Sequence, residues 1–159
     1  MSDLCITVAA YDDLTKAQTD WTLVEAAGDA NSVYISDAAM LGRDPDGRVE
    51  NIHRQSHHGW GKGAVVGAVW GLVFPPALIG GALAGGVGGG VIARLNRSLD
   101  RGDLKDLGDA MDAGEVAIVA VTDTGSVKTL QGLLTNATKS ETKVGGDADD
   151  VQRALDAEA

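Results

Sequence analysis

The chain has 159 residues, a mass of 16.3 kDa and a formal net charge of −10, because 13 Lys and Arg oppose 23 Asp and Glu. Nucleic acid is bound by neutralising its phosphates with Lys and Arg, so this balance excludes it as the main partner. Cys5 is the single cysteine, which excludes an internal disulfide framework and suits a reducing compartment such as the cytoplasm.

Charge divides the chain into three parts. Residues 1–62 carry ten acidic and five basic side chains, residues 63–93 carry none, and residues 94–159 carry thirteen acidic and eight basic ones. The uncharged part also holds ten of the 22 glycines. We therefore expect four units, namely the first half of an α+β domain (βαββ) over 1–58, a Gly-rich apolar helical hairpin over 59–101, the second half of the domain over 102–144, and an acidic C-terminal helix over 145–159.

The first part has the pattern of a strand, a helix and a hairpin. Small or apolar side chains fill both alternating sets of residues 4–9, as in a strand that is covered on two faces. Asp12 or Asp13 can cap the following helix, which ends at Gly28. A strong turn signal at residues 43–48 separates two more strands. The predicted elements are a strand over 4–9, a helix over 14–28, and strands over 33–41 and 49–54.

The last part supplies the remaining elements. Its most strand-like run is apolar on both faces, and we expect strand 116–121 to be paired along both edges, with residues 138–144 or a second subunit covering the edge that is otherwise open. The predicted elements are a helix over 103–113, strands over 115–121 and 138–144, and helices over 125–135 and 147–159. Without the insert, the order of strands and helices is that of a ferredoxin-like α+β sandwich.

The uncharged segment is longer than the roughly 20 residues that cross a bilayer as a helix. Pro75 and Pro76 break it near its middle, because two prolines remove two backbone donors and clash with the preceding turn. Basic residues stand on both sides of it, including Lys62, Arg94 and Arg97, which favours two cytoplasmic ends. The pattern predicts a helical hairpin whose ends lie on the same side of a membrane.

Glycine spacing predicts how this segment packs. Small residues recur every fourth position on each side of the proline break, and each row forms a groove where another backbone can approach closely. Trp60 and Lys62, with Arg94 and Arg97, are the expected anchors at a membrane interface. The glycines expected to mediate self-association are Gly59, Gly63, Gly67, Gly71, Gly81, Gly85 and Gly89.

These features resemble a known family. The runs 61–68, 103–108 and 113–117, together with Pro75-Pro76, are similar to the bacterial domain of unknown function 1269 family of predicted membrane proteins. The chain is more remotely similar to Gly-rich general stress proteins. The resemblance spans about residues 4–140 and implies membrane association, with no established reaction. After Gly114 the family often has a small residue, Ser, Ala and Leu, where this chain has residues 115–118 as Glu-Val-Ala-Ile.

No motif predicts a reaction, a metal site or a cofactor. His53, His57 and His58 cluster near Glu50, but His53 falls in a predicted strand, which removes the helical spacing a metal site would need, and a polar collar with histidines that change charge near neutral pH is favoured. Residues 88–93 mimic a dinucleotide fingerprint without the strand that should precede it.

We therefore expect a non-enzymatic, self-associating protein that places a glycine-zipper hairpin in or on the cytoplasmic side of the bacterial inner membrane, with a stress-related role as one possibility. Two alternatives stay open. One is a soluble, cytoplasmic homo-oligomer or filament in which the hairpins pack against each other. The other is a small-ligand-binding ferredoxin-like module. Fractionation of membranes from soluble particles separates the first two hypotheses.

Overall fold

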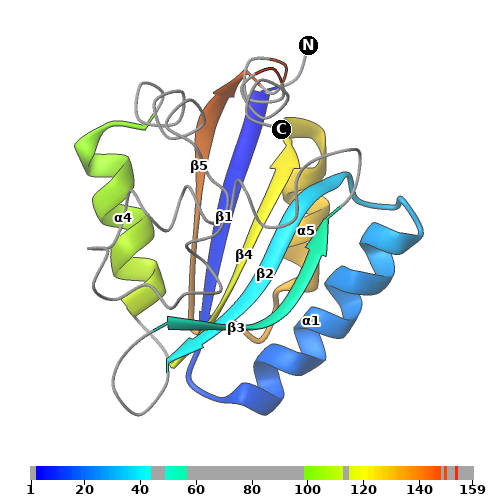
Figure 1. Cartoon of the computed structure of the whole chain (residues 1–159), viewed down its shortest axis with the longest axis vertical. Helices are drawn as coiled ribbons and strands as arrows, with labels where there is room; N and C mark the ends of the chain where they lie inside the picture. Colours follow the sequence, from blue (N-terminus) through cyan, green and yellow to red (C-terminus); the bar gives the residue numbers. More distant parts are fainter. Residues whose placement is uncertain are drawn as a thin grey trace.

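The computed structural model describes residues 3–43, 49–56, 99–112 and 115–147, together with Asp149 and Arg153. These residues form one sheet and three α-helices (Figure 1). The elements are β1 (Asp3–Tyr11), α1 (Leu14–Asp29), β2 (Ile35–Arg43), β3 (Val49–Ser56), α4 (Arg101–Asp112), β4 (Val116–Asp123), a 3-10 turn (Thr124–Ser126), α5 (Val127–Leu133) and β5 (Lys139–Asp147). Each matches a predicted element within a few residues.

The local signals act as expected at the start of α1. The Asp13 carboxylate accepts hydrogen bonds from the backbone N–H groups of Thr15 at 2.6 Å and Lys16 at 3.4 Å. This satisfies amides that have no partner within the first turn of a helix. The cap fixes the direction in which the chain leaves β1 and packs α1 against the sheet.

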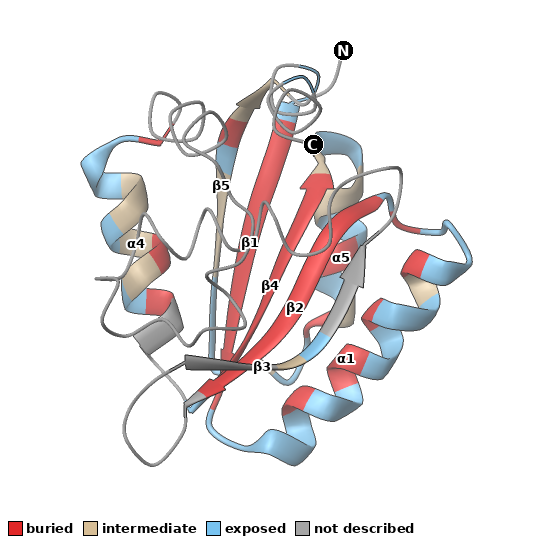
Figure 2. Ribbon diagram, viewed as in Figure 1, coloured by how far each residue is buried: buried red, intermediate tan, exposed pale blue. Residues whose placement is uncertain are grey.

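The sheet has the strand order β3-β2-β4-β1-β5, and all of its pairs are antiparallel. The three central strands are buried along their length (Figure 2). β4 pairs with β1 on one side and with β2 on the other. The prediction that this strand is paired along both edges is confirmed, but β5 does not cover it, because β5 pairs with the far edge of β1.

Helices cover both faces of the sheet. Two neighbouring residues of β5 demonstrate this, because successive side chains of a strand point to opposite faces. Thr142 accepts a hydrogen bond from Gln131 of α5, whereas Lys143 binds Asp106 of α4. α1 lies on the same face as α5 and shares its core. In Figure 1, α5 passes behind the sheet and α4 lies beside β5.

The prediction of a ferredoxin-like sandwich interrupted by a helical hairpin is wrong. The sheet has five strands, β3 is an edge strand, and the helix that follows the insert packs on the opposite face from α1. The described residues contain no helical hairpin. The physical reason is that β1 and β4 are apolar on both sides, and a two-layer arrangement leaves one of these sides exposed. Of the predicted units 59–101 and 145–159, the structure describes residues 99–101, Asp149, Arg153 and residues 145–147, and the last of these belong to β5.

Candidate functional site

The Gly-rich part of the chain follows a strand of the sheet and precedes a helix that packs on the same sheet. β3 ends at Ser56, and the described chain resumes at Leu99, just before α4. α4 leads into β4, which belongs to the same sheet as β3. Residues 57–98 therefore connect two points of one folded domain. We call β3 and α4 the attachment elements, and they form the candidate functional site.

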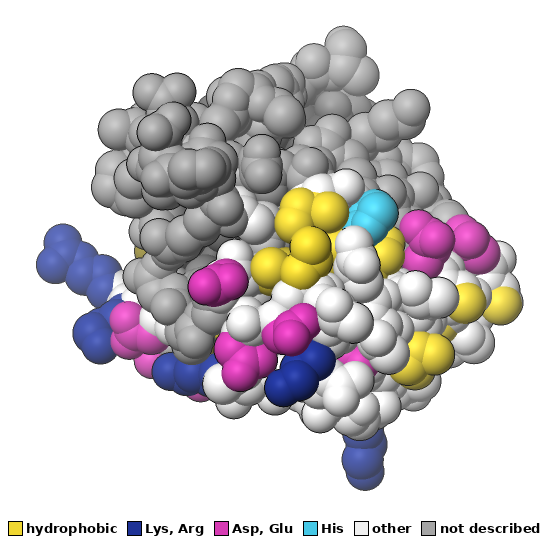
Figure 3. Space-filling model, turned by 90° about the horizontal axis from the view of Figure 1, so that it is seen from below, with side chains coloured by type: hydrophobic (Ala, Val, Ile, Leu, Met, Phe, Trp, Pro, Cys, Tyr) yellow, Lys and Arg dark blue, Asp and Glu magenta, His cyan; other side chains and the backbone are white. Residues whose placement is uncertain are grey.

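An aromatic pair holds β3 against α1. The rings of His53 and Trp21 stack with centroids 5.8 Å apart and an angle of 11° between their planes. His53 is exposed, whereas Trp21 is buried and Ile52 packs against the same core. Seen from below, hydrophobic side chains gather beside the histidine (Figure 3). The stack therefore fixes β3 shortly before the chain enters the Gly-rich segment.

A reciprocal cap begins α4. The Asp100 carboxylate accepts a hydrogen bond from the backbone N–H of Asp103 at 2.7 Å, and the Asp103 carboxylate accepts one from the N–H of Asp100 at 3.3 Å. Both carboxylates also lie at the positive end of the helix dipole. Leu99, which precedes the cap, is 2 % exposed. The cap and the buried leucine fix the point where the chain returns to the domain.

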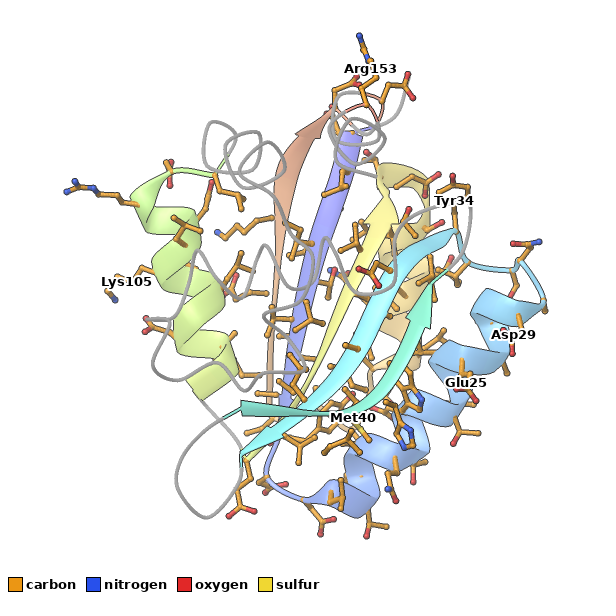
Figure 4. All side chains as sticks on the ribbon, in the orientation of Figure 1. Glu25, Asp29, Tyr34, Met40, Lys105 and Arg153 are labelled. Atoms are coloured by element: carbon orange, nitrogen blue, oxygen red, sulfur yellow. The ribbon has the colours of Figure 1, made fainter. Side chains whose placement is uncertain are left out.

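α4 docks on the sheet through one apolar stripe. Leu107 and Ala110 of this helix are fully buried, and α4 contacts both β1 and β5. The opposite side of the helix is polar. There Lys105 forms an exposed ion pair with Asp109 at 3.0 Å and extends away from the sheet (Figure 4). The helix is therefore amphipathic, and its apolar side is used by the domain itself.

An ionic contact ties α4 to β5. The Lys143 Nζ donates a hydrogen bond to the Asp106 carboxylate at 2.9 Å and lies 3.7 Å from Asp103. The hydrogen bond raises the pKa of Lys143 and lowers the pKa of Asp106. Both groups thus stay charged over a wider pH range than in the unfolded chain. Because these side chains are partly exposed, the contact positions the helix more than it stabilises the fold.

The described part of the chain also contains a buried carboxylate, Asp20, which is fully inaccessible. It accepts hydrogen bonds from the Tyr11 hydroxyl at 2.8 Å, from the Asn136 backbone N–H at 3.0 Å and from the Asn136 Nδ2 at 2.7 Å. These three bonds join β1, α1 and the turn between α5 and β5. Since a substrate cannot reach the carboxylate, the network serves the fold and not a reaction.

The environment of Tyr11 predicts a pH dependence. Burial, and then the hydrogen bond and charge of Asp20, raise the pKa of Tyr11 far above its usual value of about 10. Above pH 10 the unfolded chain loses this proton while the folded chain keeps it, so stability falls as pH rises. We expect the stability advantage of the parent over Tyr11→Phe to shrink by about 1.4 kcal/mol per pH unit above 10. Urea unfolding of both proteins between pH 8 and 11 measures this, and a constant difference would contradict it.

Cys5 is buried in β1, with 2 % of its surface exposed. Its Sγ lies 4.0 Å from the Thr124 hydroxyl. Burial raises the pKa of the thiol, which keeps it protonated, and only the thiolate is an effective nucleophile. Among residues 3–43, 49–56, 99–112 and 115–147, no group of three or more His, Cys, Asp or Glu side chains is placed to hold a metal ion.

The residues predicted to mediate self-association and membrane contact lie outside the described residues. So do His57 and His58, and no described residue tests the predicted histidine collar beyond His53. No helix in the described part of the chain is long and apolar enough to cross a membrane. The residues concerned are Gly59, Trp60, Lys62, Gly63, Gly67, Gly71, Pro75, Pro76, Gly81, Gly85, Gly89, Arg94 and Arg97.

Two contacts of the described fold were not expected from the sequence. One is the Asp20 network. Asp20 lies between Ala17 and Val24 on the buried side of α1, and an acidic residue within an apolar stripe indicates a buried polar contact. The other is the contact between Lys143 and Asp106, which lie on separate elements and carry no local signal.

Comparisons with known proteins identify no relatives. No protein-family description matches this chain, and neither a curated protein nor a solved structure with significant similarity is found. The resemblance to the domain of unknown function 1269 family therefore stays a prediction.

Proposed function

We propose that this chain is a non-enzymatic, self-associating protein that attaches to the cytoplasmic side of the inner membrane through its Gly-rich apolar residues 63–93. One observation carries the proposal. The strands before and after these residues, β3 and β4, lie in one sheet, so both flanks of the segment are held by a single domain. A chain attached in this way contacts a membrane without dividing its domain between two compartments.

The composition of the segment and its flanks supports lipid contact. Residues 63–93 carry no charge, while Lys62 stands before them and Arg94 and Arg97 follow. Basic residues near both ends favour a cytoplasmic position for both. Trp60 supplies an indole ring, which prefers the boundary between lipid and water. The acidic remainder of the chain, which gives the net charge of −10, is expected to stay in the aqueous phase.

The glycine rows support self-association. Each glycine in a helix costs roughly 0.5–1 kcal/mol relative to alanine, so a segment with ten of them needs close packing to offset this cost. Rows of small residues at every fourth position allow two backbones to approach closely, and this is the packing that membrane helices use. We therefore assign the contact between subunits to Gly63, Gly67, Gly81 and Gly85, together with the other glycines of the same rows.

The proposal is tested by finding on which side of the membrane each flank of the Gly-rich segment lies. In a Cys5→Ser background, single cysteines are introduced at Lys16, before the segment, and at Lys128, after it, because both positions are exposed on helices. We expect a membrane-impermeant maleimide to label neither in intact cells and both after lysis, with the protein in the carbonate-resistant membrane pellet. Labelling of only one position in intact cells would contradict the proposal. A large soluble particle in place of a membrane pellet would establish the soluble assembly instead.

A further inference from the structure

β5 is an edge strand whose outer side is unpaired among the described residues. The sheet order ends at β5, and its inner side pairs with β1. Its outer backbone N–H and C=O groups form a row that another strand can pair with. Val144 in this strand is 50 % exposed, which makes it one of the largest exposed apolar side chains of the described fold.

The charges on β5 select one way of pairing with a second copy. Lys139, Glu141 and Lys143 point to the same face, because they alternate along the strand. An antiparallel pair centred on Thr142 places each Glu141 opposite Lys143 of the other copy, twice by symmetry. A pair centred on Glu141 places the two Glu141 side chains opposite each other and Lys139 opposite Lys143, so like charges meet at every charged position. The strand is therefore self-complementary in the first register and repulsive in the second.

The surroundings of Lys143 leave room for this contact. An ammonium group has three N–H donors, and in the described fold Lys143 uses one in its hydrogen bond to Asp106. The Glu141 side chain is partly exposed, and its charge acts on Lys143 of the same strand. The pairing is short, because a shift of register near Gly146, which has a φ of 104°, ends the regular part of β5 after Val144. The contact is therefore expected to be weak by itself.

We propose that β5 is an interface for a second copy of this chain, in which the two strands pair antiparallel about Thr142. The inference rests on the proposed self-association and adds a contact separate from the glycine rows. Two different contacts per subunit allow an assembly to grow beyond a dimer, and each raises the effective concentration for the other.

The test uses charge reversal and cross-linking. Glu141→Lys places like charges at both symmetric contacts, and we expect it to weaken the concentration-dependent dimer roughly 5- to 30-fold in analytical ultracentrifugation. Glu115→Lys is the matched control, because Glu115 is exposed, lies outside β5 and changes the net charge equally. We expect it to leave the dimer unchanged. Circular dichroism confirms that both variants fold.

Cross-linking gives a readout that does not depend on charge. In a Cys5→Ser background, Thr142→Cys places two thiols opposite each other at the symmetry axis, and we expect an oxidised dimer. Unchanged association of Glu141→Lys, or no cross-link at position 142, would overturn the inference. Either result alone leaves the proposed function intact if large assemblies persist. A cross-linked dimer that persists in Gly67→Leu, with the larger assembly lost, identifies β5 and the glycine rows as separate contacts.

Discussion

Asp20→Ala is expected to lower the free energy of unfolding by about 3–5 kcal/mol. The substitution removes the acceptor for the buried Tyr11 hydroxyl and for two donors of Asn136, whose bonds to Asp20 are partly buried. The buried Tyr11 donor left without a partner costs roughly 1–3 kcal/mol, and each of the two Asn136 bonds contributes about 1 kcal/mol. Domains of this kind are stable by about 5–15 kcal/mol in total, so the loss is a large part of it. Urea denaturation monitored by circular dichroism measures the change.

Two further variants distinguish the effect of losing these hydrogen bonds from the effect of losing side-chain volume. Asn136→Ala removes one donor but keeps the backbone N–H bond to Asp20, so we expect a smaller loss of about 1 kcal/mol. Asp20→Asn keeps the shape of the side chain but offers a single acceptor oxygen, and its effect should fall between the other two. Equal effects of Asp20→Ala and Asn136→Ala would show that the carboxylate does not organise these contacts.

Gly67→Leu and Gly85→Leu are each expected to weaken self-association by roughly 5- to 150-fold. A branched side chain fills the groove through which a second backbone approaches, and overpacking of this kind costs about 1–3 kcal/mol at each site. Leucine is more hydrophobic than glycine, so partitioning into lipid should persist or increase. Light scattering in detergent, together with membrane fractionation of the same variants, measures the two effects separately.

Gly132→Leu is the matched control for these substitutions. A Cβ atom at Gly132 meets no other atom within 4 Å, and the residue is exposed on α5. The variant adds the same side chain outside the proposed interface and should keep the parental assembly. The proposed glycine interface is wrong if Gly67→Leu and Gly85→Leu also keep that particle size while remaining folded.

The elements of the described domain followed from local patterns in the sequence. Alternating small and apolar residues gave the position of β1, and an apolar run gave the position of β4. The sequence offered Asp12 or Asp13 as the cap of α1, and the structure uses Asp13. The burial of β4 between two strands also followed, because a strand that is apolar on both faces needs partners and cover on all sides. These features depend on residues that are neighbours along the chain.

Strand order and the placement of α4 were decided only by the tertiary structure. Local periodicity states which side of an element is apolar, but it does not state which other element covers that side. The apolar faces of β1 and β4 required cover on both sides of the sheet, but no local pattern identified α4 as the helix that provides part of this cover. The Asp20 network depends on the same long-range choice, since Asn136 lies 116 residues further along the chain and reaches Asp20 only when the strands take this order.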